Sequence, residues 1–156
     1  MRVLLQISIA ACLAIVGVAY AAETAAPAPY DVALAQRLGA DERGMKSYVL
    51  VILKGGPKEP GSEAERSKLF QGHMANIKRL AAEGKLVVAG PLAKNARDYA
   101  GIYVLNIADV AAADALMASD PAVAAGAFAY EAYGWYGSAA LQEVTALHER
   151  IDKTGR

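Results

Sequence analysis

Cysteine and histidine are scarce in this chain, and their scarcity excludes several kinds of chemistry. The 156 residues include one cysteine, Cys12, and two histidines, His73 and His148. A disulfide within the chain needs two cysteines, and a His/Cys metal centre needs three or four such ligands. We therefore expect a fold without disulfide bonds and a protein that uses no bound metal ion.

An excess of charge of either sign is also missing. The chain has 16 basic and 16 acidic residues, and 55% of its residues are hydrophobic. Nucleic-acid binders usually carry a basic face, and disordered chains have too few apolar residues to form a core. The turn Gly55-Gly56-Pro57 lacks the Lys-Ser/Thr of a phosphate loop. These absences predict one globular domain that does not bind nucleic acid.

The first 21 residues have the pattern of a secretory signal peptide. Arg2 precedes an apolar stretch from Val3 to Ala19, and Ala19-Tyr20-Ala21 fits the small-x-small rule for signal peptidase. We predict a signal peptide over residues 1–21, with cleavage after Ala21 or Ala22. The protein is then expected to be periplasmic or secreted.

Two other interpretations of this segment stay open. It is about as long as a short membrane span, so an uncleaved anchor is one alternative, and only then would the chain meet a membrane. Ile9-Ala10-Ala11-Cys12 resembles a lipobox, although the apolar part before Cys12 is short. If cleavage follows Ala21, the mature chain contains no thiol.

The rest of the chain divides into a linker, a domain and a tail. Residues 22–45 begin with an Ala/Pro-rich spacer and include a possible short helix over Val32–Leu38, between Asp31 and Gly39. The domain covers residues 46–140. Residues 141–156 are expected to form a C-terminal helix, with its helical pattern over Leu141–Ile151.

Turn residues and apolar patterning predict six elements within the domain. Tyr48–Leu53 is a continuous apolar run, which indicates a strand buried on both faces. Ser62 and Glu65 form a capping-box pattern for a helix that runs to about Glu83. The other expected elements are strands over Lys85–Ala89 and Gly101–Ile107, a helix over Val110–Ala118, a helical turn after Asp120-Pro121, and a strand over Ala127–Tyr136.

This order of elements predicts an α+β fold, the ferredoxin-like βαββαβ arrangement. Two helices cover only one face of a four-stranded sheet. However, the first and third expected strands have no polar face. The second face therefore needs a cover, which we expect to be a second copy of the sheet in a two-fold homodimer. Tail segments of the same chain are the alternative cover.

The long helix carries the most specific candidate residue, His73. At 100° per residue, His73 falls in the apolar stripe that starts at Phe70 and includes Ile77 and Leu80. An imidazole there is either a core histidine with one hydrogen bond or a pocket group that moves a proton. Arg66 points the same way and is either an anion-binding residue or a solvated first-turn residue. We take Arg66 and Phe70 as candidate binding residues.

Asp120 has two possible roles. Asp before Pro at a helix start is what N-capping alone would select. A carboxylate can also orient a histidine and fix its tautomer. Sequence spacing does not show whether Asp120 and His73 meet.

Aromatic residues are concentrated in the last expected strand. Alternation points Phe128, Tyr130 and Tyr136 one way and Tyr133 and Trp135 the other, together with Glu131. They form either core and dimer interface or the wall of a pocket for a flat organic ligand. We take Tyr130, Tyr133 and Trp135 as candidate binding residues. His148 lies among charged residues and is expected to be solvated.

An ordered set of motifs resembles the YCII-related (YciI-like) family over about residues 46–140. The resemblance implies a ferredoxin-like subunit that forms a dimeric α/β barrel, with His73 and Asp120 as the catalytic pair of a pocket. Relatives often have Pro at the position of Gly134, and the predicted export departs from their usual cytoplasmic setting. The motifs are Tyr48–Pro57, His73–Ile77, Gly84–Leu86, Gly90–Leu92, Asp120–Val123 with Gly126, and Trp135–Gly137.

Two hypotheses about function follow. Some relatives of the family are fused or related to enzymes of chlorinated aromatic rings, and the wider superfamily includes lactone isomerases and monooxygenases. The first hypothesis is a small exported isomerase- or lyase-like enzyme, without metal or cofactor, in which His73 moves a proton on a small aromatic or lactone-like substrate and Asp120 orients it. The second is a non-catalytic periplasmic dimer that binds a small ligand or has a structural role.

Overall fold

The computed structural model describes residues 29–154 of the chain. The expected signal peptide over residues 1–21, its cleavage at Ala21 or Ala22, and the lipobox at Cys12 lie outside the described residues, as does most of the Ala/Pro-rich spacer. Within residues 29–154, no helix is both long enough and apolar enough to cross a membrane.

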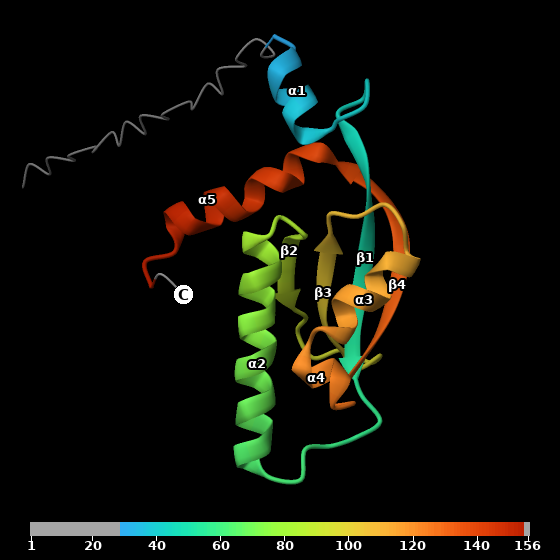
Figure 1. Cartoon of the computed structure of the whole chain (residues 1–156), viewed down its shortest axis with the longest axis vertical. Helices are drawn as coiled ribbons and strands as arrows, with labels where there is room; N and C mark the ends of the chain where they lie inside the picture. The colour runs from blue at the N-terminus through green and yellow to red at the C-terminus, as the bar shows by residue number, and fades with distance from the viewer. Residues whose placement is uncertain (1–28, 155–156) are drawn as a thin grey trace, which may run out of the picture. The chain divides into compact units, whose positions relative to one another are not determined.

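One antiparallel sheet of four strands forms the centre of the fold, with the strand order β2-β3-β1-β4 (Figure 1). This order, with helices between the first and second and between the third and fourth strands, confirms the predicted ferredoxin-like βαββαβ arrangement. The strands are β1 (Met45–Gly55), β2 (Leu86–Pro91), β3 (Tyr99–Leu105) and β4 (Phe128–Ser138).

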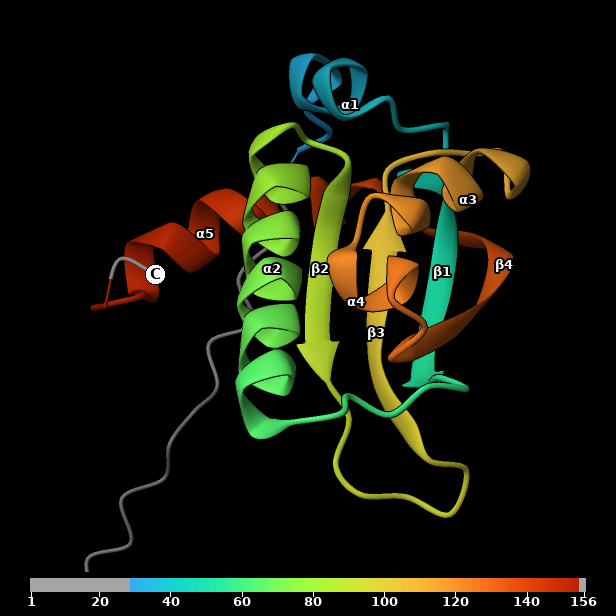
Figure 2. The ribbon, with the colours of Figure 1, turned by 60° about the horizontal axis from the view of Figure 1, so that its bottom comes forward.

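Three helices cover one face of the sheet (Figure 2). They are α2 (Glu63–Ala82), α3 (Ala111–Ala118) and α4 (Pro121–Ala124). The main core lies between them and the sheet, and its helical members are Leu80, Ala113 and Met117. The sheet side of this core comes from alternate residues of the central strands, which point to the same face. These are Val49, Val51, Leu53, Tyr103 and Leu105.

The predicted caps are present at the helix starts. The Ser62 hydroxyl accepts the backbone N–H of Glu65 at 3.2 Å, which is one half of a capping box, and the Glu65 carboxylate accepts the N–H of Gly61 instead of that of Ser62. Asp31 accepts the N–H of Leu34 and begins α1 (Val32–Leu38), which ends at Gly39 with a φ of +62°. Leu38 is buried and Arg37 pairs with Glu143 at 2.7 Å, so α1 packs against the domain.

The tail differs from the expected single helix over Leu141–Ile151. A 3-10 turn, η1 (Ala139–Glu143), comes first, and α5 (Val144–Ile151) follows. The Gln142 amide donates to the carbonyls of Leu38 and Ala139. These side-chain hydrogen bonds hold the tighter turn against the start of the domain, which the helical pattern alone did not reveal.

The second face of the sheet is only partly covered by the tail. Leu141 of η1 packs on a smaller cluster formed by Tyr48, Val87 and Val104. Farther along β4, Tyr133 is 50% exposed and Trp135 is 38% exposed. The tail segments therefore cover the part of this face near β2, and aromatic side chains remain accessible on the edge strand β4.

Candidate active site

Helix α2 and the short helix α4 meet closely beside His73. Gly72 lies against Pro121, and a Cβ atom at Gly72 would be 3.0 Å from Pro121 Cγ. A side chain there would push the rigid proline ring away, because such a contact is tighter than ordinary van der Waals packing. Gly72 therefore allows α4 to approach α2, and this approach brings Asp120 to His73.

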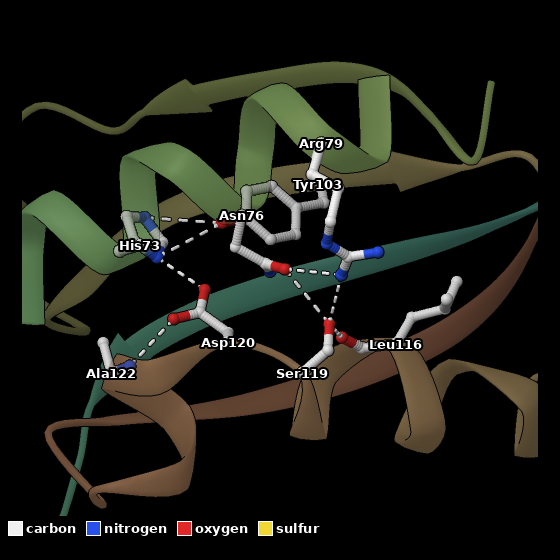
Figure 3. A network of polar contacts seen from close by, with 8 residues as sticks. All are labelled: His73, Asn76, Arg79, Tyr103, Leu116, Ser119, Asp120 and Ala122. Atoms are coloured by element: carbon white, nitrogen blue, oxygen red, sulfur yellow. Dashed lines mark hydrogen bonds and ion pairs between the residues drawn. The ribbon is translucent and has the colours of Figure 1, made fainter. Parts of the chain in front are cut away.

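His73 and Asp120 are in direct contact (Figure 3). His73 Nδ1 lies 2.6 Å from Asp120 Oδ2, and the Asp120 side chain is fully buried. The other carboxylate oxygen, Oδ1, accepts the backbone N–H of Ala122 at 2.9 Å. Asp120 thus caps α4 and contacts the imidazole at once, so the two roles considered from the sequence are compatible.

This contact assigns different tasks to the two ring nitrogens of His73. A carboxylate only accepts, so Nδ1 donates its proton to Asp120 and Nε2 keeps its lone pair, which can accept the Tyr103 O–H. The Tyr103 hydroxyl lies 3.3 Å from Nε2 and 3.4 Å from Nδ1. Burial, and to a smaller extent the Asp120 carboxylate, raises the pKa of Tyr103 far above its usual value, so this phenol stays neutral. An Nε2 atom held in this tautomer can accept a proton.

Aromatic rings surround the imidazole. Phe128 meets it edge-on with ring centroids 5.1 Å apart, Tyr103 stacks at 6.1 Å and Phe70 lies at 6.4 Å. The side chain of His73 is 9% exposed as a result. His73 is therefore a buried histidine with a charged partner.

A cavity of about 280 Å³ lies next to this pair. Its lining, within the described residues, is Pro60, Arg66, Leu69, Phe70, Ala122, Ala127 and Phe128. His73 is not among them, but the rings of Phe70 and Phe128 lie next to the imidazole and the Ala122 N–H donates to Asp120. The catalytic candidates thus lie directly behind the cavity wall.

Two of the candidate binding residues line this cavity. Arg66 is exposed, and its Nε lies 3.6 Å from the Glu63 carboxylate one turn earlier. Phe70 is 59% exposed, although it starts the predicted inward stripe. The stripe therefore opens toward solvent at its N-terminal end, where the helices do not cover it.

The other three candidate binding residues lie elsewhere in the described structure. The Tyr130 hydroxyl donates to Asp114 at 2.7 Å; burial and this hydrogen bond raise the pKa of Tyr130 to about 12. On the opposite face, Tyr133 donates to Glu131, and Trp135 packs against Tyr48 with centroids 5.9 Å apart. The alternation of β4 explains this separation, because Tyr130 faces the helices and its odd-numbered neighbours do not.

Glu131 forms a polar cluster on that opposite face. Its carboxylate accepts from Lys54 at 2.6 Å and from Tyr133 at 2.8 Å. Both hydrogen bonds lower the pKa of Glu131, with Lys54 the larger cause. The half-buried carboxylate is thus ionised and paired.

The sequence did not indicate a polar network one helical turn beyond His73. Arg79 donates to Asn76 Oδ1 at 2.7 Å and to Ser119 Oγ at 2.9 Å, and the Ser119 hydroxyl donates to the Leu116 carbonyl (Figure 3). Asn76 is buried and lies three residues after His73. Helical spacing could therefore have predicted that it shares the inward face with His73. The network ties α2 to the residue that precedes Asp120.

His148 lies at a second, smaller cavity of about 200 Å³ between α2, β2 and α5. Its side chain is exposed there, in line with the predicted solvation. The remaining lining is mostly apolar: Ile77, Ala81, Leu86, Val87, Val88, Ala89, Val144 and Thr145. Among the described residues, no three His, Cys, Asp or Glu side chains gather as a metal site would require.

Known proteins give one match at the level of a family. The family model described as YCII-related domain matches residues 49–135. No curated protein matches. Among solved structures, the chain is similar to the 5-chloro-2-hydroxyhydroquinone dehydrochlorinase of Burkholderia phenoliruptrix in complex with 2,5-dihydroxybenzoquinone, with 23% identity and a TM-score of 0.40 over 56% of this chain and 92% of that one. Because the family model covers more than half of the sequence, the protein belongs to the YCII-related domain family.

Proposed function

We propose that this protein is a small exported enzyme that transfers a proton on a small organic substrate through His73, with Asp120 as its partner. The observation that carries the proposal is the 2.6 Å contact between His73 Nδ1 and the fully buried Asp120 carboxylate. A buried carboxylate on one nitrogen of an imidazole fixes the tautomer and can balance the charge of an imidazolium that forms during a reaction. The adjacent cavity provides the place for a substrate.

The proposed step begins when His73 Nε2 accepts a proton from a weakly acidic C–H or O–H group. The electron pair left on the substrate moves toward a neighbouring carbonyl or ring, or it expels a leaving group. Return of the proton to another atom completes an isomerisation, and departure of an anion completes a lyase reaction. Asp120 keeps Nδ1–H throughout and balances the charge of the imidazolium. The step uses only this chain's side chains, so we propose no cofactor.

Access to His73 depends on Phe70 in this proposal. The imidazole is 9% exposed, whereas Phe70 is 59% exposed. A rotation of Phe70 would join the cavity to Nε2. The low exposure of His73 also favours the alternative function, a non-catalytic dimer that binds a small ligand or has a structural role. A histidine buried in the core can have a purely structural role and needs no contact with a substrate.

Replacement of Asp120 by Asn tests the proposal against this alternative. The amide introduced by Asp120→Asn can still accept the Ala122 N–H, but its NH₂ group donates to Nδ1 and moves the imidazole proton to Nε2. We expect activity toward a panel of small cyclic ketones, lactones and halogenated phenols to fall about 10²- to 10⁴-fold in Asp120→Asn and in His73→Gln. Imidazole ¹⁵N shifts verify the tautomer change. Turnover unaffected by both substitutions would disprove the proposal.

We also propose that the open β4 side of the second sheet face binds a second copy of the chain. The exposed Tyr133 pairs with the half-buried Leu50 of β1, and the partly exposed Trp135 pairs with Tyr48. Aromatic residues of this kind are enriched in homodimer interfaces. Sedimentation at micromolar concentration should give a dimer for the wild type and a monomer for Tyr133→Glu. A monomeric wild type would reject this interface.

Export is proposed from the N-terminal pattern alone. The intact mass of the protein recovered outside the cytoplasm should correspond to a chain that begins at Ala22 or Glu23. A full-length mass in the membrane fraction would favour the anchor, and a lipid adduct at Cys12 would favour the lipoprotein.

A further inference from the structure

The cavity beside His73 has a simple chemical character. Six of its lining residues are apolar, and the seventh, Arg66, is the only one that carries a charge. Two of the apolar residues, Phe70 and Phe128, present phenyl rings, whose centroids lie 6.4 Å and 5.1 Å from that of the His73 imidazole. A ligand of this cavity therefore meets aromatic surface near His73 and a positive charge at Arg66.

The Arg66 guanidinium is available to a ligand. Among the described residues its one ion pair is the 3.6 Å contact of Nε with Glu63, and the two side chains are 60% and 88% exposed. Such exposed pairs contribute little and are easily exchanged. The two terminal NH₂ groups can bind a carboxylate in the bidentate geometry that guanidinium favours.

The size of the cavity limits the ligand to a compact molecule. Its volume is about 280 Å³, at the lower end of ligand pockets. An apolar cavity of about 150 Å³ is enough for benzene. One ring with one or two substituents therefore fits within it.

We propose that the substrate class of this site is a single-ring organic anion, with its carboxylate on Arg66 and its ring between Phe70 and Phe128. This inference rests on the proposed function for the role of His73, but the binding mode stands without catalysis. The anionic group fixes the orientation, and the ring is held next to the imidazole. Neutral rings of the same shape lose the contact with Arg66 and bind more weakly.

Benzoate and its neutral isostere benzamide test the proposal as probes. In NMR titrations of the wild type, we expect benzoate to bind about five- to tenfold more tightly than benzamide, since hydrogen bonds to a charged acceptor are roughly twice as strong as neutral ones. Arg66→Gln should abolish this preference. Lys68→Gln is the matched control, because it removes the same charge from the exposed side of the same helix and should keep the preference.

The outcomes separate this proposal from the proposed function. His73→Gln should still prefer benzoate, because Arg66 and both phenyl rings remain. A preference for benzoate that depends on Arg66, together with no His73-dependent turnover, supports the anion site and rejects the catalytic role. Equal binding of the two probes, a preference that survives in Arg66→Gln, or no binding of either probe would overturn the anion site.

Discussion

At the scale of single residues, the site depends on the lack of a side chain at Gly72. Gly72 lies in the middle of α2, where glycine costs about 1 kcal/mol relative to alanine in helix propensity. Pro121 occupies the space that a Cβ would need. The chain therefore accepts a weaker helix, and in return α4 comes close enough for Asp120 to reach His73.

Gly72→Ala should separate these two effects. We expect the roughly 1 kcal/mol gain in helix propensity to be cancelled, because the new Cβ displaces Pro121. The His73–Asp120 contact should weaken, which would appear as a changed Nδ1–H chemical shift. Ser67→Ala, on an exposed position of the same helix, should show the propensity gain without the change at His73. A stabilised Gly72→Ala with an unchanged imidazole signal would contradict this account.

At the scale of the elements, α2 holds α3 and α4 by polar as well as apolar contacts. Arg79 reaches Ser119, and Ser119 is next to Asp120, so one guanidinium fixes the junction between the two short helices. Asn76 accepts from the same guanidinium from within the core. The short α4, with four residues, has too few contacts of its own to fix the position of Asp120.

Arg79→Met should loosen this junction, because methionine retains an apolar side chain at this position but lacks the guanidinium. We expect a loss of about 1 kcal/mol in the free energy of unfolding, since the side chain is 46% exposed and its hydrogen bonds are partly screened. Amide exchange in residues 119–124 should become faster. Lys78→Met, its exposed neighbour on α2, is the control and should change neither quantity. Unaltered exchange in α4 would show that apolar packing alone positions Asp120.

The sequence predicted local features well and distant contacts poorly. The Ser62 and Asp120 caps and the alternation of β4 follow from neighbours in the chain, and each is present. The contact of His73 with Asp120 spans 47 residues and depends on how α4 packs on α2, which no local pattern encodes. Phe70 shows the same limit of local patterns. Helical phase correctly places it on the inward stripe, but phase does not reveal that no other element of the described structure covers it there.

At the scale of the whole molecule, buried phenols couple stability to alkaline pH. Burial and the hydrogen bond to Asp114 raise the pKa of Tyr130 to about 12, and burial raises that of Tyr103 further, whereas a tyrosine in an unfolded chain ionises near pH 10. When folding raises the pKa of a phenol, the resulting stabilisation is fully present at pH values below the pKa of the unfolded chain. This stabilisation is lost as the pH rises through the pKa of the folded state. The folded state should therefore lose stability from about pH 10 upward, because the unfolded chain releases its phenolic protons first.

Tyr130→Phe should reduce this loss. Between about pH 10 and 12, the free energy of unfolding should fall less steeply in the variant than in the wild type, because one fewer phenol is held neutral by folding. At pH 8 the variant should be modestly less stable, since Asp114 loses the hydrogen bond from Tyr130. Chemical denaturation at a series of pH values measures both effects. Parallel curves for the two proteins above pH 10 would mean that Tyr130 ionises in the folded domain as freely as in the unfolded chain. The packing of β4 against α3 would then be looser than the 2.7 Å contact between the Tyr130 hydroxyl and Asp114 requires.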